Sequence, residues 1–293
     1  MGDDRGGPRK GGPRNSSHLR RGLWYHAGPM KAWTATRFRQ AKGRQKLACL
    51  TAYDSLTARL IDEAGLPLIL VGDTLGMTLL GYTSTLPVTM EQMLHHAAAV
   101  SRGVAHALVV ADLPFLSYQC STEQALLNAG RFLKEAGADA VKIEGGAFRA
   151  DLVRLLAANG IPVMGHIGLT PQSVHTLGGY KVQGRGAEEA ARLRADAAAL
   201  DAAGVFALVL ECIPAALAGE ITASVAAPTI GIGAGPACDG QVLVSTDMLG
   251  LDERFRAKFV KRYADIGGRM RAAFAAYGQE VAEGKFPGPE HGY

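Results

Sequence analysis

Residues 66–73, LPLILVGD, give the first indication of the fold, because they join an apolar run to a glycine and an aspartate. A similar arrangement, an apolar run that ends in an acidic residue, recurs as ALVVAD at 107–112, AVKIE at 140–144 and FALVLE at 206–211. Runs without regular polar alternation are typical of parallel strands that are covered on both faces. Amphipathic segments with helical periodicity follow these runs, so the chain alternates strand and helix.

This alternation extends along most of the chain and predicts a barrel. The expected strands are 47–50, 66–72, 107–111, 140–143, 162–167, 206–210, 229–232 and 242–244. The expected helices are 54–64, 89–102, 121–136, 148–159, 186–203, 214–225 and 254–284. Seven or eight such units within about 200 residues fit a closed (β/α)8 barrel of the TIM type best. An open, doubly wound parallel sheet is the alternative α/β architecture.

The first 30 residues differ in composition from the rest of the chain. They include seven glycines, three prolines and six of the 31 basic residues. Such a segment cannot bury enough apolar surface to offset the entropy of ordering, so residues 1–30 are expected to form a disordered basic tail. A start codon placed too early, with Met30 as the initiator, and a tail that contacts RNA are the alternatives. Residues 31–293 contain no linker and are expected to form one domain, the barrel with its C-terminal helices.

Composition and charge exclude several classes of protein. With 48% hydrophobic and 20% charged residues, the chain is neither disordered throughout nor fibrous. Stretches without charged residues are interrupted by glycine, threonine and proline, which argues against a membrane span. The net charge of +4 comes from the tail, because residues 31–293 hold 25 basic and 25 acidic residues. The folded part therefore lacks the basic surface that nucleic-acid binding requires.

The four cysteines indicate a reducing compartment. Cys49, Cys120, Cys212 and Cys238 are widely spaced and include no C-x-x-C pair, which excludes zinc-ribbon and thioredoxin-type motifs. Reduced, mostly buried thiols of this kind are typical of a cytoplasmic protein. No apolar signal segment follows the basic N-terminal residues, so a secretory leader is not expected.

Titratable residues stand where five of the predicted strands end. They are Asp73, Asp112, Glu144, His166 and Glu211. In a barrel, the carboxyl ends of all strands meet at one rim, where the active site lies. We therefore expect these residues to share a site. Taken singly, an acidic residue after a strand is also common as a helix N-cap or in a solvated turn.

Carboxylates gathered at one rim predict a divalent cation. Without a counter-charge, Asp73, Asp112 and Glu144 would raise one another's pKa at a cost in stability. Oxygen ligands favour a hard ion, Mg²⁺ ahead of Ca²⁺ or Mn²⁺. Lys142 lies on the same strand face as Glu144 and is a candidate anchor for a substrate carboxylate or phosphate, or else a structural partner of an acid. Glu211 is a candidate general base, or else a structural carboxylate.

Two glycine-rich segments carry weaker signals. TIGIGAG at 229–235 does not have the G-x-G-x-x-G spacing, so it does not indicate a dinucleotide site. The long loop 168–186 is typical of a segment that closes over an active site. The sequence assigns no role to its His175, Tyr180 or Lys181.

Nine blocks, in order along the chain, resemble the ketopantoate hydroxymethyltransferase family. They are TAYD (51–54), VGDTLGM (71–77), STLPVT (84–89), ADLPF (111–115), VKIEGG (141–146), GHIGLTPQSV (165–174), GGYKVQGRG (178–186), VLECIP (209–214) and IGIGAGPACDGQ (230–241). The similarity runs from about residue 35 to the C-terminus, and its motifs are longer than barrels share in general.

The resemblance implies an activity and a set of residues. The reaction moves a hydroxymethyl group from 5,10-methylenetetrahydrofolate to 3-methyl-2-oxobutanoate and gives 2-dehydropantoate, for pantothenate and coenzyme A. By resemblance, Asp73 and Asp112 bind Mg²⁺ and the keto acid, and Glu144 belongs to the metal shell. Lys142 contacts the keto acid, and Glu211 accepts the proton that leaves its C3 carbon.

Further expectations come from the same resemblance. Thr74 stands where the family usually has serine; it keeps the hydroxyl, so we count it among the substrate-binding residues. His166 is a candidate additional active-site residue. Family members are cytoplasmic homo-oligomers, often decamers, so the expected partners are small-molecule substrates and further copies of the chain, with no nucleic acid and no membrane.

Two other functions remain open from the sequence. Another Mg²⁺-dependent, enolate-forming barrel enzyme of the isocitrate lyase or phosphoenolpyruvate mutase type would share the acidic rim. Its nucleophilic K-x-C-G loop does not occur in this chain. A catalytically inactive barrel would be expected to lack one of the acids at the rim, and all of them are present.

Overall fold

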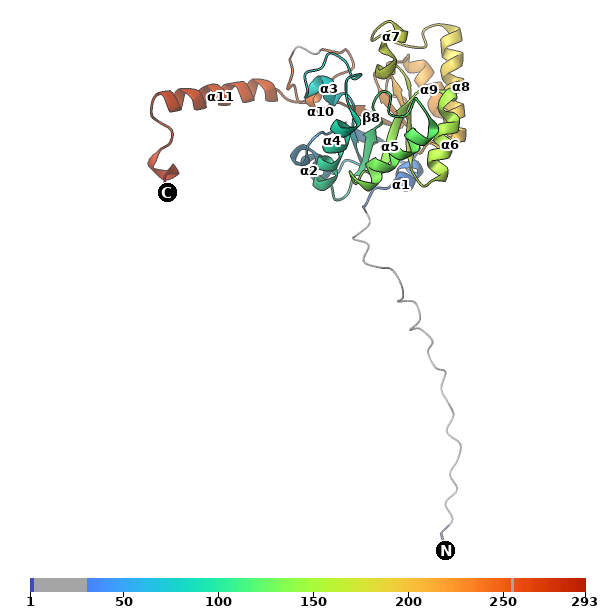
Figure 1. Ribbon diagram of the computed structural model, residues 1–293, viewed down its shortest axis with the longest axis horizontal. Helices are drawn as coiled ribbons and strands as arrows, with labels where there is room; N and C mark the ends of the chain where they lie inside the picture. Colours follow the sequence, from blue (N-terminus) through green and yellow to red (C-terminus); the bar gives the residue numbers. More distant parts are fainter. Residues whose placement is uncertain (3–30, 254–255) are drawn as a thin grey trace. The chain divides into compact units, whose positions relative to one another are not determined.

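The computed structural model of the protein describes residues 1, 2, 31–253 and 256–293. The chain divides into two units, Met1–Met30 and Lys31–Tyr293. The predicted disordered tail belongs to the first unit, and its residues 3–30 lie outside the described residues. The second unit contains the barrel (Figure 1).

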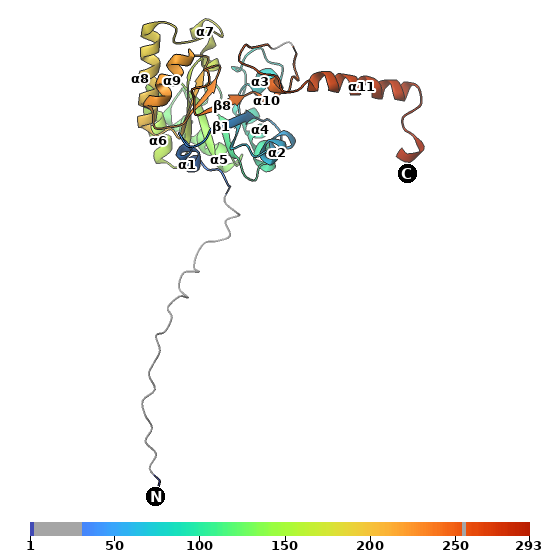
Figure 2. The ribbon, with the colours of Figure 1, turned by 180° about the vertical axis from the view of Figure 1, so that it is seen from behind.

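Eight parallel strands form a closed barrel, which confirms the predicted (β/α)8 fold. The strands are β1 Leu47–Thr51, β2 Leu68–Val71, β3 Leu108–Asp112, β4 Ala140–Glu144, β5 Val163–Gly168, β6 Ala207–Glu211, β7 Thr229–Ile232 and β8 Gly240–Leu243. The barrel closes where β8 pairs with β1, with Gly240 opposite Leu47 and Leu243 opposite Leu50. Figure 2 shows these two strands side by side.

Helices precede the first strand, lie between the strands and follow the last one. They are α1 Ala35–Gln40, α2 Ser55–Glu63, α3 Leu75–Thr78, α4 Met90–Gly103, α5 Thr122–Lys134, α6 Ala150–Ala158, α7 Val174–Leu177, α8 Ala187–Ala203, α9 Ala215–Ser224, α10 Ser245–Met248 and α11 Ile266–Ala282. Side-chain caps set several starts: Thr89 and Gln92 form a reciprocal capping box at α4, an arrangement worth about 1 kcal/mol. None of the helices in the described ranges is long and apolar enough to cross a bilayer.

Alternate residues of the strands enter two separate hydrophobic clusters. Side chains such as Leu70 and Val110 fill the barrel interior, whereas Ile69 and Val109 pack outward against the helices. Phe38 of α1 is fully buried with the interior cluster and meets the ring of Phe206 edge to face, with 5.9 Å between centroids. Helix α1 therefore packs at the end of the barrel where β6 begins, which leaves the opposite, carboxyl end for a site.

The C-terminal region differs from the sequence prediction. A helix was expected over 254–284, of which 254–255 lie outside the described residues; the structure has α11 at Ile266–Ala282. The preceding chain is held instead by long-range backbone hydrogen bonds, from Tyr263 N–H to Met248 O at 2.8 Å and from Ile266 N–H to Leu249 O at 3.0 Å. Asp265 then caps α11 by accepting from Gly268 N–H. These tertiary contacts override the local helical periodicity.

Candidate active site

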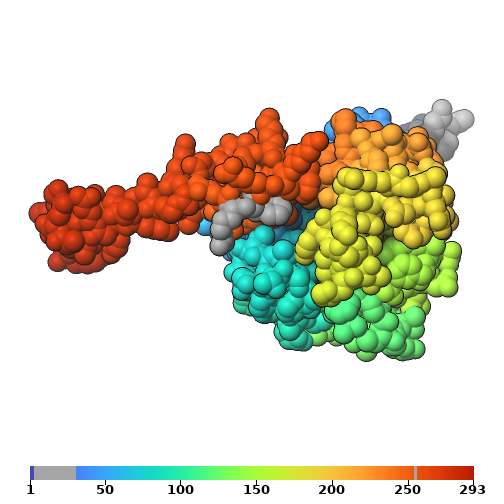
Figure 3. Space-filling view, turned by 90° about the horizontal axis from the view of Figure 1, so that it is seen from above, coloured from blue at the N-terminus to red at the C-terminus, as the bar shows by residue number. Residues whose placement is uncertain are grey.

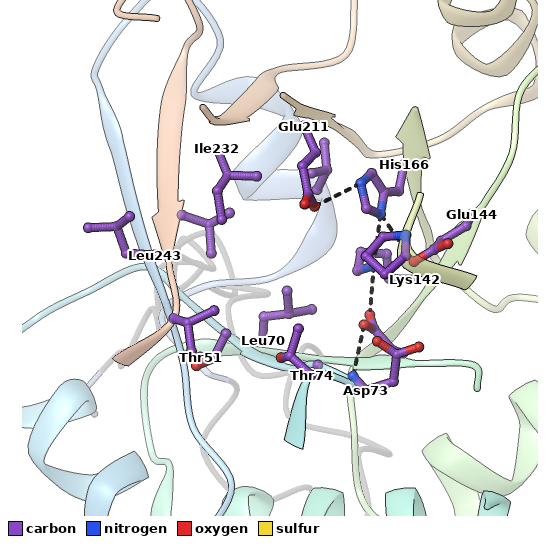
Figure 4. Close-up of a pocket in the computed structure, with 16 residues that line it drawn as sticks. Thr51, Leu70, Asp73, Thr74, Lys142, Glu144, His166, Glu211, Ile232 and Leu243 are labelled. Atoms are coloured by element: carbon purple, nitrogen blue, oxygen red, sulfur yellow. Dashed lines mark hydrogen bonds and ion pairs between the residues drawn. The ribbon is translucent and has the colours of Figure 1, made fainter. Parts of the chain in front are cut away.

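One pocket at the carboxyl end of the barrel collects the side chains that the sequence singled out (Figure 4). It is lined by Asp73, Thr74, Asp112, Lys142, Glu144, His166 and Glu211, among others. Three of the acids are the last residues of their strands, β3, β4 and β6. Asp73 follows β2 by two residues, and His166 lies inside β5 rather than beyond its end. The empty space of the pocket, its open mouth included, is about 440 Å³.

The first acidic pair comes from neighbouring strands. Asp73 donates its backbone N–H to Asp112 Oδ2 at 3.1 Å, and both side chains are buried. Burial, followed by the charges of Asp112 and Glu144, raises the pKa of Asp73 well above its ordinary value. Burial also raises the pKa of Asp112, against the attraction of Lys142. The repulsion expected from three gathered carboxylates is therefore present.

Lys142 lies between the acids and His166. Strand register sets it opposite Asp112, and its Nζ lies 3.1 Å from Asp112 Oδ1. The same Nζ is 3.2 Å from His166 Nδ1. Burial disfavours the charge of Lys142, but Asp112, Glu144 and Asp73 together raise its pKa above the ordinary value. A fully charged ammonium is thus held in the pocket.

His166 connects two carboxylates across the pocket. Its Nε2 lies 3.2 Å from Glu211 Oε2, and its Nδ1 lies 3.6 Å from Glu144 Oε1. Burial and Lys142 lower the pKa of His166, but the neighbouring carboxylates of Glu144 and Glu211 outweigh them and raise it to about 9. Glu211 is the more accessible of the two acids, with its side chain 18% exposed. It is therefore the carboxylate placed to meet a ligand that enters from solvent.

Gln172 is a residue of the site that the sequence analysis missed. Its Nε2 donates to Asp73 Oδ2 at 2.9 Å, and its backbone N–H donates to Glu144 Oε2 at 3.0 Å. Tyr118 OH donates to Gln172 Oε1 at 2.7 Å. The Gln172 side chain is an amide and does not titrate, so a pattern of acidic and basic residues does not include it. One feature of the sequence could have indicated Gln172. It is a polar residue in a Thr-Pro-Gln turn, which proline restricts, and this turn follows the strand that carries His166.

Thr74 occupies the remaining predicted position. Its hydroxyl lies 2.9 Å from the hydroxyl of Tyr53, and either group can donate. Burial raises the pKa of Tyr53 to about 12, so the phenol stays protonated. The Thr74 side chain is thus oriented within the pocket wall rather than free to rotate.

The donor set fits a hard divalent cation. Four carboxylates and two cationic groups line the pocket, which leaves two excess negative charges when all six are ionised. Within residues 31–253 and 256–293, no group of three or more His, Cys, Asp or Glu side chains is positioned to hold a metal ion. Mg²⁺ commonly needs one or two carboxylates, because waters and substrate oxygens complete its shell. The neighbouring carboxylates of Asp73 and Asp112 meet that requirement.

A closed (β/α)8 barrel with charged side chains converging at the carboxyl ends of its strands is the architecture of a barrel enzyme. Comparison with known proteins identifies which kind. The chain belongs to the ketopantoate hydroxymethyltransferase family, whose model matches residues 32–289. This confirms the family that the sequence motifs indicated and makes the chain a transferase enzyme.

Relatives that carry the name 3-methyl-2-oxobutanoate hydroxymethyltransferase are similar to this chain over most of their length. The 3-methyl-2-oxobutanoate hydroxymethyltransferase of Syntrophus aciditrophicus (strain SB) is 58% identical over 252 residues, 86% of this chain and 93% of the relative. That of Moorella thermoacetica (strain ATCC 39073 / JCM 9320) is 59% identical over 249 residues, 85% of this chain and 93% of the relative.

Solved structures with similar folds are more distant. The chain is similar to 2,3-dimethylmalate lyase, a member of the phosphoenolpyruvate mutase/isocitrate lyase superfamily, with a TM-score of 0.55 and 17% identity over 87% of this chain and 92% of that one. Phosphoenolpyruvate phosphomutase from Streptomyces platensis subsp. rosaceus also gives a TM-score of 0.55 at 17% identity, over 86% of this chain and 88% of that one. At this identity the likeness concerns the fold alone.

Proposed function

We propose that this chain transfers a hydroxymethyl group from 5,10-methylenetetrahydrofolate to 3-methyl-2-oxobutanoate and so forms 2-dehydropantoate. The observation that carries the proposal is the division of the pocket into two parts. A buried acidic part holds Asp73 and Asp112 beside the Lys142 ammonium, and a more accessible carboxylate, Glu211, stands across from it. The first part suits the carboxylate and keto oxygens of an α-keto acid, and the second suits removal of a proton.

Each charged side chain has a role in this proposal. Lys142 attracts the carboxylate of the keto acid, with Thr74 as a further polar contact. Asp73 and Asp112 would hold Mg²⁺, and Glu144 would belong to its shell. When bound, Mg²⁺ supplies Lewis-acid stabilisation of the negative charge that develops on the keto oxygen, an effect of several kcal/mol.

Glu211 is the proposed base. Its carboxylate removes the C3 proton of the keto acid, and the C–H electron pair enters the C2–C3 bond to form the enolate. His166 Nε2 lies 3.2 Å from Glu211 Oε2, and an ion pair between them would keep the carboxylate directed into the pocket. Overall, one water is consumed: C3 gains a CH₂OH group, and the two C–N bonds of the methylene bridge are replaced by N–H bonds.

A direct assay tests this reaction. The purified chain is incubated with both substrates and Mg²⁺, and 2-dehydropantoate is followed by mass spectrometry. We expect formation of product that depends on both substrates and stops when EDTA removes the metal. Cleavage of 2-hydroxy diacids without any hydroxymethyl transfer would instead favour an isocitrate lyase-type activity.

We further propose that the chain works as a homo-oligomer in the cytoplasm. Large apolar side chains of α11, among them Phe274, Tyr277 and Val281, are exposed to solvent. Ala48 of β1 and Gln241 of β8 are exposed on the outer barrel face, a position that is buried on most of the other strands. Both features suit contact with another copy of the chain. All four cysteines are free thiols, as the cytoplasm favours.

A further inference from the structure

The segments that follow three strands at the carboxyl end of the barrel carry exposed apolar side chains. We define the apolar collar as Met77, Leu79, Phe115, Leu116, Tyr180 and Val182, all of which are exposed. They come in pairs from the segments that follow β2, β3 and β5, with Met77 in α3, and these segments leave the carboxyl end of the barrel where the acids lie. Apolar side chains gathered at one place, rather than scattered, are characteristic of a binding surface.

Contacts tie the collar to the acidic pocket. Tyr180 OH lies 3.7 Å from Met77 Sδ, which joins the loop after β5 to the segment after β2. Figure 3 shows these segments, coloured yellow and teal, against each other. Gln183 donates its backbone N–H to Cys212 O at 2.9 Å, directly after Glu211. Burial, then the charges of Asp73, Glu211 and Glu144, raise the pKa of Tyr180, as expected for a phenol near those carboxylates.

Backbone strain occurs at the same place. Leu116 has a φ of +63° and Cys212 a φ of +47°, and these are the non-glycine residues with positive φ in the described part of the chain. Leu116 nevertheless leaves 53% of its surface exposed, so burial in this chain does not account for the strain. Residues held in such conformations cluster at ligand-binding sites.

We propose that the apolar collar binds the reduced pterin and aminobenzoyl part of the folate co-substrate, with its glutamate tail directed toward Lys181 and Arg185. The inference rests on the proposed function, because the one-carbon unit has to reach the keto acid beside Glu211. The acidic pocket suits the smaller substrate, so the larger one is left to approach over its mouth. The planar pyrimidinone and aminobenzoyl rings of this ligand match Tyr180 and Phe115 in chemistry.

Charges beside the collar match the acidic end of that ligand. Lys181 and Arg185 line a shallow second cavity together with Tyr180 and Val182. Glu188 and Glu189 line the same cavity, but Glu189 Oε2 is turned to the backbone N–H of Gly184 at 3.1 Å. The two cations lie on the same loop as Tyr180 and line the same cavity. A tail with several glutamates therefore gains more from them than a tail with one.

The test compares two reactions of the same variants. Exchange of the C3 hydrogen of 3-methyl-2-oxobutanoate with D₂O needs Mg²⁺ and the acidic pocket but no folate. Hydroxymethyl transfer needs the collar as well. Tyr180→Ala and Leu116→Ala are expected to raise the KM for 5,10-methylenetetrahydrofolate roughly tenfold and to leave exchange within about twofold of the wild type. Leu127→Ala, which removes an exposed leucine from α5, is the matched control and should change neither rate.

The cations are tested with two forms of the co-substrate. The double variant K181Q/R185Q is expected to raise the KM for the triglutamate form more than that for the monoglutamate form. Lys134→Gln, an exposed lysine of α5, serves as its control. The outcome will be clearest at low ionic strength, where exposed charges are least screened.

The outcomes separate this inference from the proposed function. If the wild type neither exchanges the C3 hydrogen nor transfers the one-carbon unit, the proposed function fails. If wild-type exchange and transfer both occur but the collar variants keep the wild-type KM for folate, the collar inference is overturned. Loss of exchange in Tyr180→Ala would also overturn it, since Tyr180 would then belong to the keto-acid pocket.

Discussion

At the residue scale, the charged side chains of the pocket contact one another and so fix one another's positions. His166 lies between Glu144 and Glu211, and Lys142 lies between Asp112 and His166. Removing one member leaves the others buried with an unmatched charge, which costs more than the pair itself contributes. The residues are therefore expected to act as a unit.

The raised pKa of His166 predicts how stability varies with pH. The folded state keeps the His166 proton up to about pH 9, whereas the unfolded chain releases it near the ordinary value of 6.5. The stabilising contribution is therefore complete below pH 6.5 and is lost as the pH rises toward 9. Urea denaturation of metal-free protein should show a falling free energy of unfolding across this range. In His166→Gln the free energy of unfolding should fall less between pH 6.5 and 9. If it falls equally in both proteins, His166 is not the cause of the pH dependence.

The hydrogen bonds of Gln172 to the acidic side chains predict that its replacement lowers the affinity for metal. Its hydrogen bonds orient Asp73 and Glu144, so Gln172→Leu should weaken divalent metal binding by roughly 10- to 100-fold. Mn²⁺ binding followed by electron paramagnetic resonance measures this without any turnover. Gln172→Glu keeps an acceptor for Tyr118 but loses the donor to Asp73, and serves as the companion variant. Unchanged Mn²⁺ affinity in Gln172→Leu would contradict the orienting role.

At the element scale, the strand ends place the chemistry, and much of this could be predicted from the sequence. Continuous apolar runs located every strand, and a spacing of two residues correctly placed Lys142 and Glu144 at the same pocket. The start of α11 could not be predicted, because the bonds from Tyr263 and Ile266 to α10 and the residue after it join segments whose proximity no local pattern encodes. The role of Gln172 depends likewise on distant partners.

The close packing at the end of β5 leads to a further prediction. Gly168 has a φ of +96°, and a Cβ there would lie 2.2 Å from the carbonyl oxygen of Glu211. Gly160 also has positive φ, at +79°, but has open space around it. Gly160→Ala should cost about 1–2 kcal/mol in the free energy of unfolding from φ alone. Gly168→Ala should cost clearly more and also slow the reaction, since it displaces the backbone of Glu211.

Denaturation and activity measurements on the two alanine variants check this. Equal losses of stability in Gly168→Ala and Gly160→Ala, with activity retained in both, would show that β5 and β6 tolerate the displacement.

At the scale of the whole molecule, exposed apolar surface on α11 predicts self-association. Replacing Phe274 and Tyr277 by serine should reduce the molar mass in solution, measured by size-exclusion chromatography with light scattering. Leu127→Ser on α5 removes an equally exposed apolar residue and should leave the mass unchanged. An unchanged mass in the Phe274→Ser, Tyr277→Ser double variant would place the contacts between copies elsewhere.

In the proposed reaction, Glu211 removes a proton from an α-keto acid held by the acidic pocket. Proton NMR of 3-methyl-2-oxobutanoate in D₂O, with Mg²⁺ and without folate, measures that step directly. We expect loss of the C3–H signal with the wild type and a rate at least about 100-fold lower with Glu211→Gln, at near-normal affinity for the keto acid. Exchange by Glu211→Gln at the wild-type rate would contradict it.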